Sequence, residues 1–98
     1  MNINMTKSGA ELTVELEGRL DTLTSPELEE QLEGKLEGIE KLVFELGKLE
    51  YISSAGLRIL VGLSQDMEEQ GELILRNITE PVKDVLDVTG LMDSFEIE

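Results

Sequence analysis

Residues 41–76 read KLVFELGKLEYISSAGLRILVGLSQDMEEQGELILR, and this segment is the most informative about the fold. Its opening residues, 41–46, include three consecutive large apolar side chains, a pattern typical of a central strand covered on both faces. Residues 54–70 carry apolar side chains at helical spacing, and residues 72–76 contain a second short apolar run. A strand, a helix and a strand in this order predict a right-handed crossover between parallel strands of one sheet.

The helix of this unit is expected to begin at Ser53 or Ser54, after a short link over residues 47–52. A serine at this point can accept a hydrogen bond from an otherwise unpaired main-chain N–H of the first turn. Gly71 is expected to end the helix. The apolar face is broad, which predicts a largely buried helix, and it consists of Leu57, Ile59, Leu60, Val61, Leu63 and Met67.

Upstream, two segments alternate between apolar and polar residues. Ile3 and Met5 belong to the first segment and residues 12–16 form the second, with turn-forming residues at 7–10 between them. Such alternation indicates two strands with one wet face, joined by a tight turn. Residues 18–21, Gly-Arg-Leu-Asp, are expected to connect the second strand to a helix.

The first helix is expected to open at residues 24–26, Thr-Ser-Pro, with Ser25 as a cap, because proline suits the first helical position. Gly38 is expected to end it. Leucines every fourth residue give this helix one apolar stripe, made of Leu28, Leu32 and Leu36.

A third helix is expected to open at Pro81 and to close at Gly90. A short final strand would raise the number of strands from four to five. The side chains expected to face the interior are Val82, Val85, Leu86 and Val88 in the helix, and Leu91, Phe95 and Ile97 after it.

These elements predict one α/β domain over residues 1–98, with a mixed four- to five-stranded sheet and helices packed mainly on one face. The chain is 40% hydrophobic but only 3% aromatic, so the core is expected to consist of Leu, Ile and Val. No linker, repeat or low-complexity tract suggests a second domain.

The excess of acidic residues restricts the kinds of partner that the protein can bind. The 22 acidic and 8 basic residues give a formal net charge of −14. A field of this sign repels phosphate backbones and anionic lipids, so no direct nucleic-acid partner is expected, and the charge also serves solubility. The chain starts without the apolar run of a signal peptide and has no run near the roughly 20 residues of a membrane helix. We therefore expect no membrane insertion and a cytoplasmic location.

Several catalytic classes are excluded by composition. The sequence has neither cysteine nor histidine, so disulfides, a zinc site and a His-based triad cannot be assembled. Residues 52–56, Ile-Ser-Ser-Ala-Gly, match only half of the Gly-x-Ser-x-Gly nucleophile elbow. Both glycine-rich nucleotide motifs are absent. The protein is therefore predicted not to be an enzyme and to need no cofactor.

Residues 49–60, Leu-Glu-Tyr-Ile-Ser-Ser-Ala-Gly-Leu-Arg-Ile-Leu, resemble the signature of STAS domains, the sulfate-transporter and anti-sigma-antagonist family. In that family a central strand and short loop deliver a hydroxyl residue to a helix start, followed by Gly-Leu. Residues 18–21 resemble a second family marker, a Gly-x-Leu-Asp loop before the first helix. The predicted element order agrees with the family over essentially the whole chain.

The resemblance implies a bacterial anti-sigma factor antagonist controlled by phosphorylation. In such members the anti-sigma factor is a serine kinase that phosphorylates the hydroxyl residue at this helix start, and a serine phosphatase resets it. Matching by Gly-Leu places the acceptor at Ser54, two residues before Gly56. Many members have Asp at the position of Ser53, so Ser53 is the alternative acceptor. The partner-binding residues implied are Asp21, Ser53, Ser54, Ala55, Gly56, Leu57 and Arg58.

Simpler roles are open for the same residues. The serine pair can act only as an N-cap, worth about 1 kcal/mol. Asp21 can be only a turn residue, and Arg58 can neutralise acidic neighbours. An alternative function keeps the fold but makes this loop a constitutive docking surface for the ATPase of an ABC-type lipid transporter.

Overall fold

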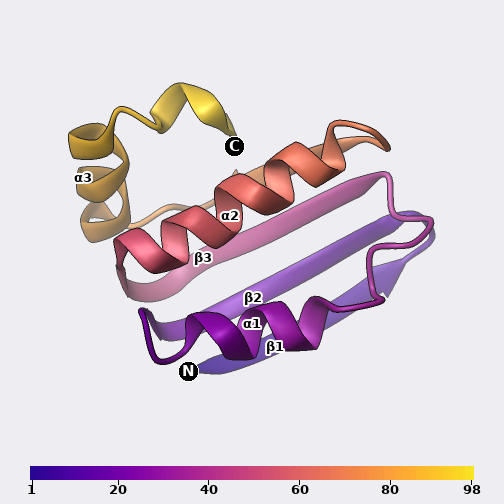
Figure 1. Ribbon diagram of the computed structural model, residues 1–98, viewed down its shortest axis with the longest axis horizontal. Helices are drawn as coiled ribbons and strands as arrows, with labels where there is room; N and C mark the ends of the chain where they lie inside the picture. Colours follow the sequence, from indigo (N-terminus) through magenta and orange to yellow (C-terminus); the bar gives the residue numbers. More distant parts are fainter.

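The computed structural model describes residues 1–98 as a five-stranded sheet with three α-helices and one 3₁₀ turn (Figure 1). The predicted order of strands and helices is confirmed, including the short final strand. The elements are β1 (Asn2–Ser8), β2 (Glu11–Leu20), α1 (Ser25–Leu32), β3 (Lys41–Ile52), α2 (Ser54–Met67), β4 (Glu72–Arg76), α3 (Glu80–Thr89), η1 (Met92–Ser94) and β5 (Glu96–Ile97).

The sheet has the strand order β1-β2-β3-β4-β5, the same as the order along the chain. The hairpin of β1 and β2 is antiparallel, whereas β2, β3, β4 and β5 are all parallel. Thr13, Val43 and Ile74 lie side by side across the three middle strands. Because β2 and β3 are parallel, their carboxyl ends meet at one edge of the sheet, where α1 and α2 begin.

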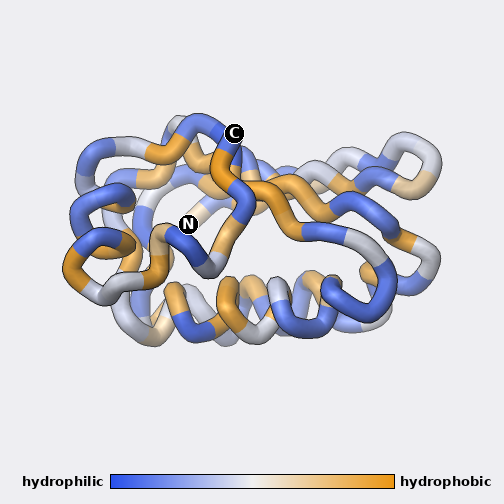
Figure 2. The backbone as a smooth tube through the Cα atoms, turned by 90° about the horizontal axis from the view of Figure 1, so that it is seen from above, coloured by the Kyte–Doolittle hydropathy of each residue, from blue (hydrophilic) through white to orange (hydrophobic).

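The helices α1 and α2 lie side by side over one face of the sheet (Figure 1). Seen from above, the turns of α1 and α2 form a layer of their own beside the strands, with hydrophobic and hydrophilic residues alternating along them (Figure 2), whereas α3 lies at one end of the molecule (Figure 1). The core between the layers is aliphatic, as predicted, and Phe44 is its largest fully buried side chain. Val43 points to the opposite face and is also buried, so burial of this central strand on both faces is confirmed.

The strand β3 is longer than predicted, since residues 47–52 continue it instead of forming a link. The reason is pairing. Residues 18–20, predicted to be part of a connection, extend β2 and pair with the second half of β3, with one irregularity in register before them and one between residues 18 and 19. Leu49 and Ile52 bury their side chains in this extension. Two segments that each look like loops therefore stabilise one another as strands.

Two helix ends differ from the prediction. The helix α1 ends at Leu32 and not at Gly38, and the intervening residues form turns in which Gly34 and Gly38 adopt positive φ. The helix α2 ends at Met67, although Gly71 still closes the turn that follows by donating its N–H to the Met67 carbonyl. The predicted closure of α3 at Gly90 is confirmed, with a left-handed conformation.

Two side-chain predictions are wrong. Val88 is 87% exposed, because it lies on the wet side of α3 while Val82 and Leu86 fill the inner side. Ser25 does not cap α1. It is buried in the first turn, and its hydroxyl donates a hydrogen bond to the main-chain carbonyl of Asp21.

Candidate functional site at the start of helix α2

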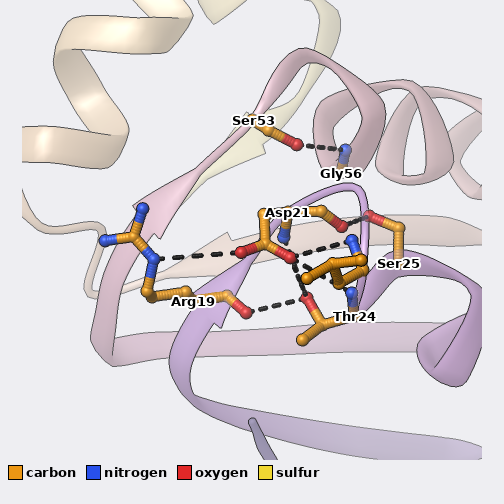
Figure 3. A network of polar contacts seen from close by, with 7 residues as sticks. Arg19, Asp21, Thr24, Ser25, Ser53 and Gly56 are labelled. Carbon is orange, nitrogen blue, oxygen red and sulfur yellow. Dashed lines mark hydrogen bonds and ion pairs between the residues drawn. The ribbon is translucent and has the colours of Figure 1, made fainter.

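The serine pair divides into one structural and one exposed hydroxyl. Ser53 is the N-cap of α2, and its Oγ accepts the main-chain N–H of Gly56 at 3.2 Å (Figure 3). Ser54 is the first residue of the helix and is exposed, and its hydroxyl makes no hydrogen bond within the chain. The capping role that the sequence allowed for either residue therefore belongs to Ser53.

The main chain at this point is tied to the end of β2. The N–H of Ser53 donates a hydrogen bond to the carbonyl of Leu20 at 2.8 Å. Gly56 packs against the same residue so closely that a Cβ there would lie 2.8 Å from the Leu20 carbonyl oxygen. Leu57 is buried in the core just beyond. Gly56 and Leu57 thus pack the start of α2 against the core, while the neighbouring residues Ser54 and Arg58 are exposed to solvent.

The loop after β2 is closed by Asp21. One carboxylate oxygen accepts the N–H groups of Leu23 and Thr24 at 3.0 and 3.1 Å (Figure 3). The Thr24 hydroxyl donates to the Arg19 carbonyl and accepts the N–H of Asp21. Hydrogen bonding by the Thr24 main chain, assisted by Leu23 and the Arg19 charge, lowers the pKa of Asp21 below its ordinary value. The carboxylate of Asp21 is thus engaged within its own loop, beside the start of α2.

Removal of this carboxylate is expected to loosen the loop. We expect Asp21→Ala to lower the unfolding midpoint at pH 7 by a few degrees, and Asp21→Asn by less, because an amide oxygen still accepts both N–H groups. A lowered carboxylate pKa stabilises the fold above the ordinary pKa of 3.8, and this contribution is lost as the pH falls through the folded-state value.

The difference between wild type and Asp21→Ala in thermal unfolding should therefore shrink below about pH 3.8. Glu69→Ala, which removes an exposed carboxylate outside the loop, serves as the control and should leave the midpoint unchanged. An Asp21→Ala difference that stays constant down to pH 2.5 would contradict this account of the loop.

Two further features beside the site were missed by the sequence analysis. The Arg19 guanidinium stacks over the ring of Tyr51, 4.4 Å from its centroid, because the two residues are paired between β2 and β3. Leu23 is 88% exposed at the tip of the Asp21 loop. The proximity of Arg19 and Tyr51 could have been predicted only if residues 18–20 and 47–52 had been assigned to paired strands.

The remaining predicted site residues are accessible on α2. Arg58 is exposed one turn after Ser54, is in no ion pair, and lies at the groove between α1 and α2. Ala55 is half-buried at the same groove. The first turn of α2 contains no acidic side chain, so the helix itself does not neutralise the positive end of its dipole. An anionic group on Ser54 would be favoured there.

Neither a metal site nor a membrane-spanning helix is found in the structure. No cluster of three or more Asp and Glu side chains converges as a metal site requires. None of the helices combines the length and the apolar character needed to span a bilayer. The site offers an exposed hydroxyl at a helix start, beside a loop that is closed by hydrogen bonds.

The chain belongs to the STAS domain family, whose model matches residues 2–98. BtrV from Bordetella bronchiseptica is 31% identical to it over 99% of this chain and 85% of its own length. The anti-sigma-B factor antagonist of Bacillus subtilis is 30% identical over 99% of this chain and 90% of its own length. The resemblance inferred from residues 18–21 and 49–60 is confirmed.

Solved structures confirm the fold. An anti-sigma factor antagonist from Mycobacterium paratuberculosis superimposes with a TM-score of 0.87 at 21% identity, over 98% of this chain and 83% of its own. SpoIIAA, an anti-sigma factor antagonist in its unphosphorylated form, gives a TM-score of 0.85 at 17% identity, over 99% and 88% of the two chains. The five-stranded sheet with its three helices is thus the STAS architecture.

Proposed function

We propose that this protein is an anti-sigma factor antagonist whose binding state is set by phosphorylation of Ser54. In the unphosphorylated form it captures an anti-sigma factor that is also a serine kinase, and the sigma factor is released. The kinase phosphorylates Ser54 and the complex dissociates. A serine phosphatase then restores the binding form, and the whole cycle runs in the cytoplasm.

The observation that carries this proposal is the division of labour between the two serines. The Ser53 hydroxyl is engaged by the N–H of Gly56, whereas the Ser54 hydroxyl is exposed and makes no hydrogen bond within the chain. A kinase can reach Ser54 without removing the cap of α2. Phosphorylation of Ser53, in contrast, would disrupt the cap and strain the start of the helix.

The charge of the phosphate explains how a local change acts on binding. A phosphoserine adds about −1.5 to −2 charges and three acceptor oxygens. Within this chain the positive end of α2 accommodates the group, so the fold persists. A partner packed over Ser54, Ala55 and Arg58 would instead have to enclose a solvated dianion, which costs binding free energy.

The relatives favour this function over docking on a transporter. The curated relatives from Bacillus subtilis and Staphylococcus aureus are anti-sigma-B factor antagonists. SpoIIAA, which shares the fold, has been solved in both an unphosphorylated and a phosphorylated form. A phosphorylation switch is therefore the function we propose for this chain.

Mapping of the phosphate tests the proposal. The protein is incubated with ATP and the anti-sigma factor kinase proposed as its partner, and the products are analysed by mass spectrometry. We expect one phosphate on wild type and on Ser53→Ala, and none on Ser54→Ala. Ser53→Ala is also expected to lose about 1 kcal/mol of stability with its cap, which separates folding from modification.

The other outcomes discriminate between the remaining alternatives. A phosphate on Ser53 would keep the switch and move the acceptor by one residue. Absence of any phosphate, with a kinase that modifies another substrate, would overturn the proposal and favour docking on a transporter ATPase.

A further inference from the structure

A groove lies between α1 and α2, on the helical side of the molecule, and begins beside the proposed switch. Ser25 and Ala55 lie at its start, and Gln70 at its far end. Its floor is apolar and contains Leu32, which is buried. The other floor residues are half-buried and therefore still accessible, namely Leu36, Ile59 and Leu63.

The rim of this groove is strongly acidic. Five carboxylates line it against a single cation, Arg58, and they are Glu29, Glu30, Glu33, Glu37 and Asp66. None of the five is in an ion pair; the four ion pairs of the structure all lie elsewhere. Three of them, at 29, 30 and 33, cluster at the carboxyl end of α1, where the helix dipole disfavours negative charge and no basic residue compensates. The negative charges of the rim thus lower the stability of α1 at its carboxyl end.

A glycine in the middle of α2 adds an independent observation. Gly62 lines the groove, and a Cβ built on it would meet no atom within 4 Å. A glycine inside a helix is less favourable than alanine, and packing within this chain does not require one here. The missing side chain leaves the floor open to close approach by another backbone.

We propose that this groove receives a basic amphipathic helix of the partner that Ser54 controls, an inference that rests on the proposed function. Grooves between helices accept a helix that presents apolar anchors three or four residues apart. From Ala55 to Asp66 the groove follows α2 for about 16 Å, the length of about three helical turns. Aliphatic side chains of the partner contact the floor, and its Lys or Arg side chains face the carboxylates of the rim. A second copy of this chain would carry the same charge and be repelled.

Charge reversal on the rim provides the first test. Glu30→Lys/Glu33→Lys is compared with Asp84→Lys/Asp87→Lys on α3, which has the same residue spacing near a helix end but lies outside the groove. Each replacement changes the charge by two, so both double variants shift the formal net charge from −14 by four, to −10. Binding of the full-length anti-sigma factor proposed as the partner is measured by calorimetry at two salt concentrations.

We expect the rim variant to raise Kd by about tenfold or more and to reduce the salt dependence of binding, while the α3 variant stays within about twofold. The rim variant should be at least as thermally stable as wild type, because lysines suit the carboxyl end of α1. Loss of binding therefore cannot be attributed to unfolding.

Filling of the groove provides the second test. Gly62→Leu should raise Kd by about tenfold or more, whereas Gln65→Leu, at an exposed position of α2 outside the groove, should leave it within about twofold. If wild type binds but the rim and Gly62 variants bind equally well, the groove assignment is overturned and the proposed function stands. If wild type itself does not bind the anti-sigma factor, the proposed function fails and this inference fails with it.

Discussion

Phosphorylation of Ser54 is expected to lower the affinity for the anti-sigma factor by about 100-fold or more, equivalent to about 2.8 kcal/mol. The exposed hydroxyl lies where α2 begins, so a dianion there would be enclosed by any partner packed on the helix start. The measurement is calorimetric titration of the anti-sigma factor with enzymatically phosphorylated and with unmodified protein.

A carboxylate at the same position is expected to reproduce part of this effect. Ser54→Glu adds one negative charge and should weaken binding by about tenfold, while Gln65→Glu adds the same charge outside the proposed contact and should change it little. An acid in the first turn favours a helix, so Ser54→Glu should fold with equal or greater stability. Equal affinities of phosphorylated and unmodified protein would refute the switch.

Replacement of Gly71 by alanine is expected to lower the free energy of unfolding by about 3 kcal/mol. A Cβ on Gly71 would lie 1.8 Å from the main-chain oxygen of Glu40. That oxygen accepts the N–H of Glu72, where β4 begins beside β3. No change of side-chain rotamer can relieve a clash with backbone, so the turn between α2 and β4 must shift.

The matched control is Gly62→Ala in the neighbouring helix. Its Cβ would enter open space, and alanine is the better helix former, so stability should rise by about 0.5–1 kcal/mol. Urea unfolding of both variants measures the two free energies. A Gly71→Ala variant as stable as wild type would show that the turn adjusts without cost.

The sequence was sufficient for the order of the elements because most of them carry strong local signals. Alternation revealed the hairpin, and consecutive apolar residues identified the centre of β3. The extension of β3 through residues 47–52 was missed because pairing with residues 18–20 is a long-range interaction that neither segment indicates alone. Likewise Val88 was assigned to the core because an apolar side chain at helical spacing does not reveal which face is covered.

The sequence motif identified the residues of the candidate site, but it did not indicate the individual role of each. The motif placed Ser53 and Ser54 at a helix start, yet only the geometry shows that Ser53 provides the cap. Asp21 was expected beside the switch, and its engagement with Leu23 and Thr24 follows from a loop shape that the sequence left open. The groove between α1 and α2 could not be foreseen, since it depends on where α1 ends.

The identity between strand order in the sheet and order along the chain bears on how the protein assembles. Each strand pairs with the one synthesised just before it, so no connection is longer than one crossover, which spans residues 21–40, 53–71 or 77–95. We expect folding that is rapid for a mostly parallel sheet. On the ribosome every emerging strand finds its neighbour already made, and the sheet can grow from one edge to the other without waiting for the C-terminus.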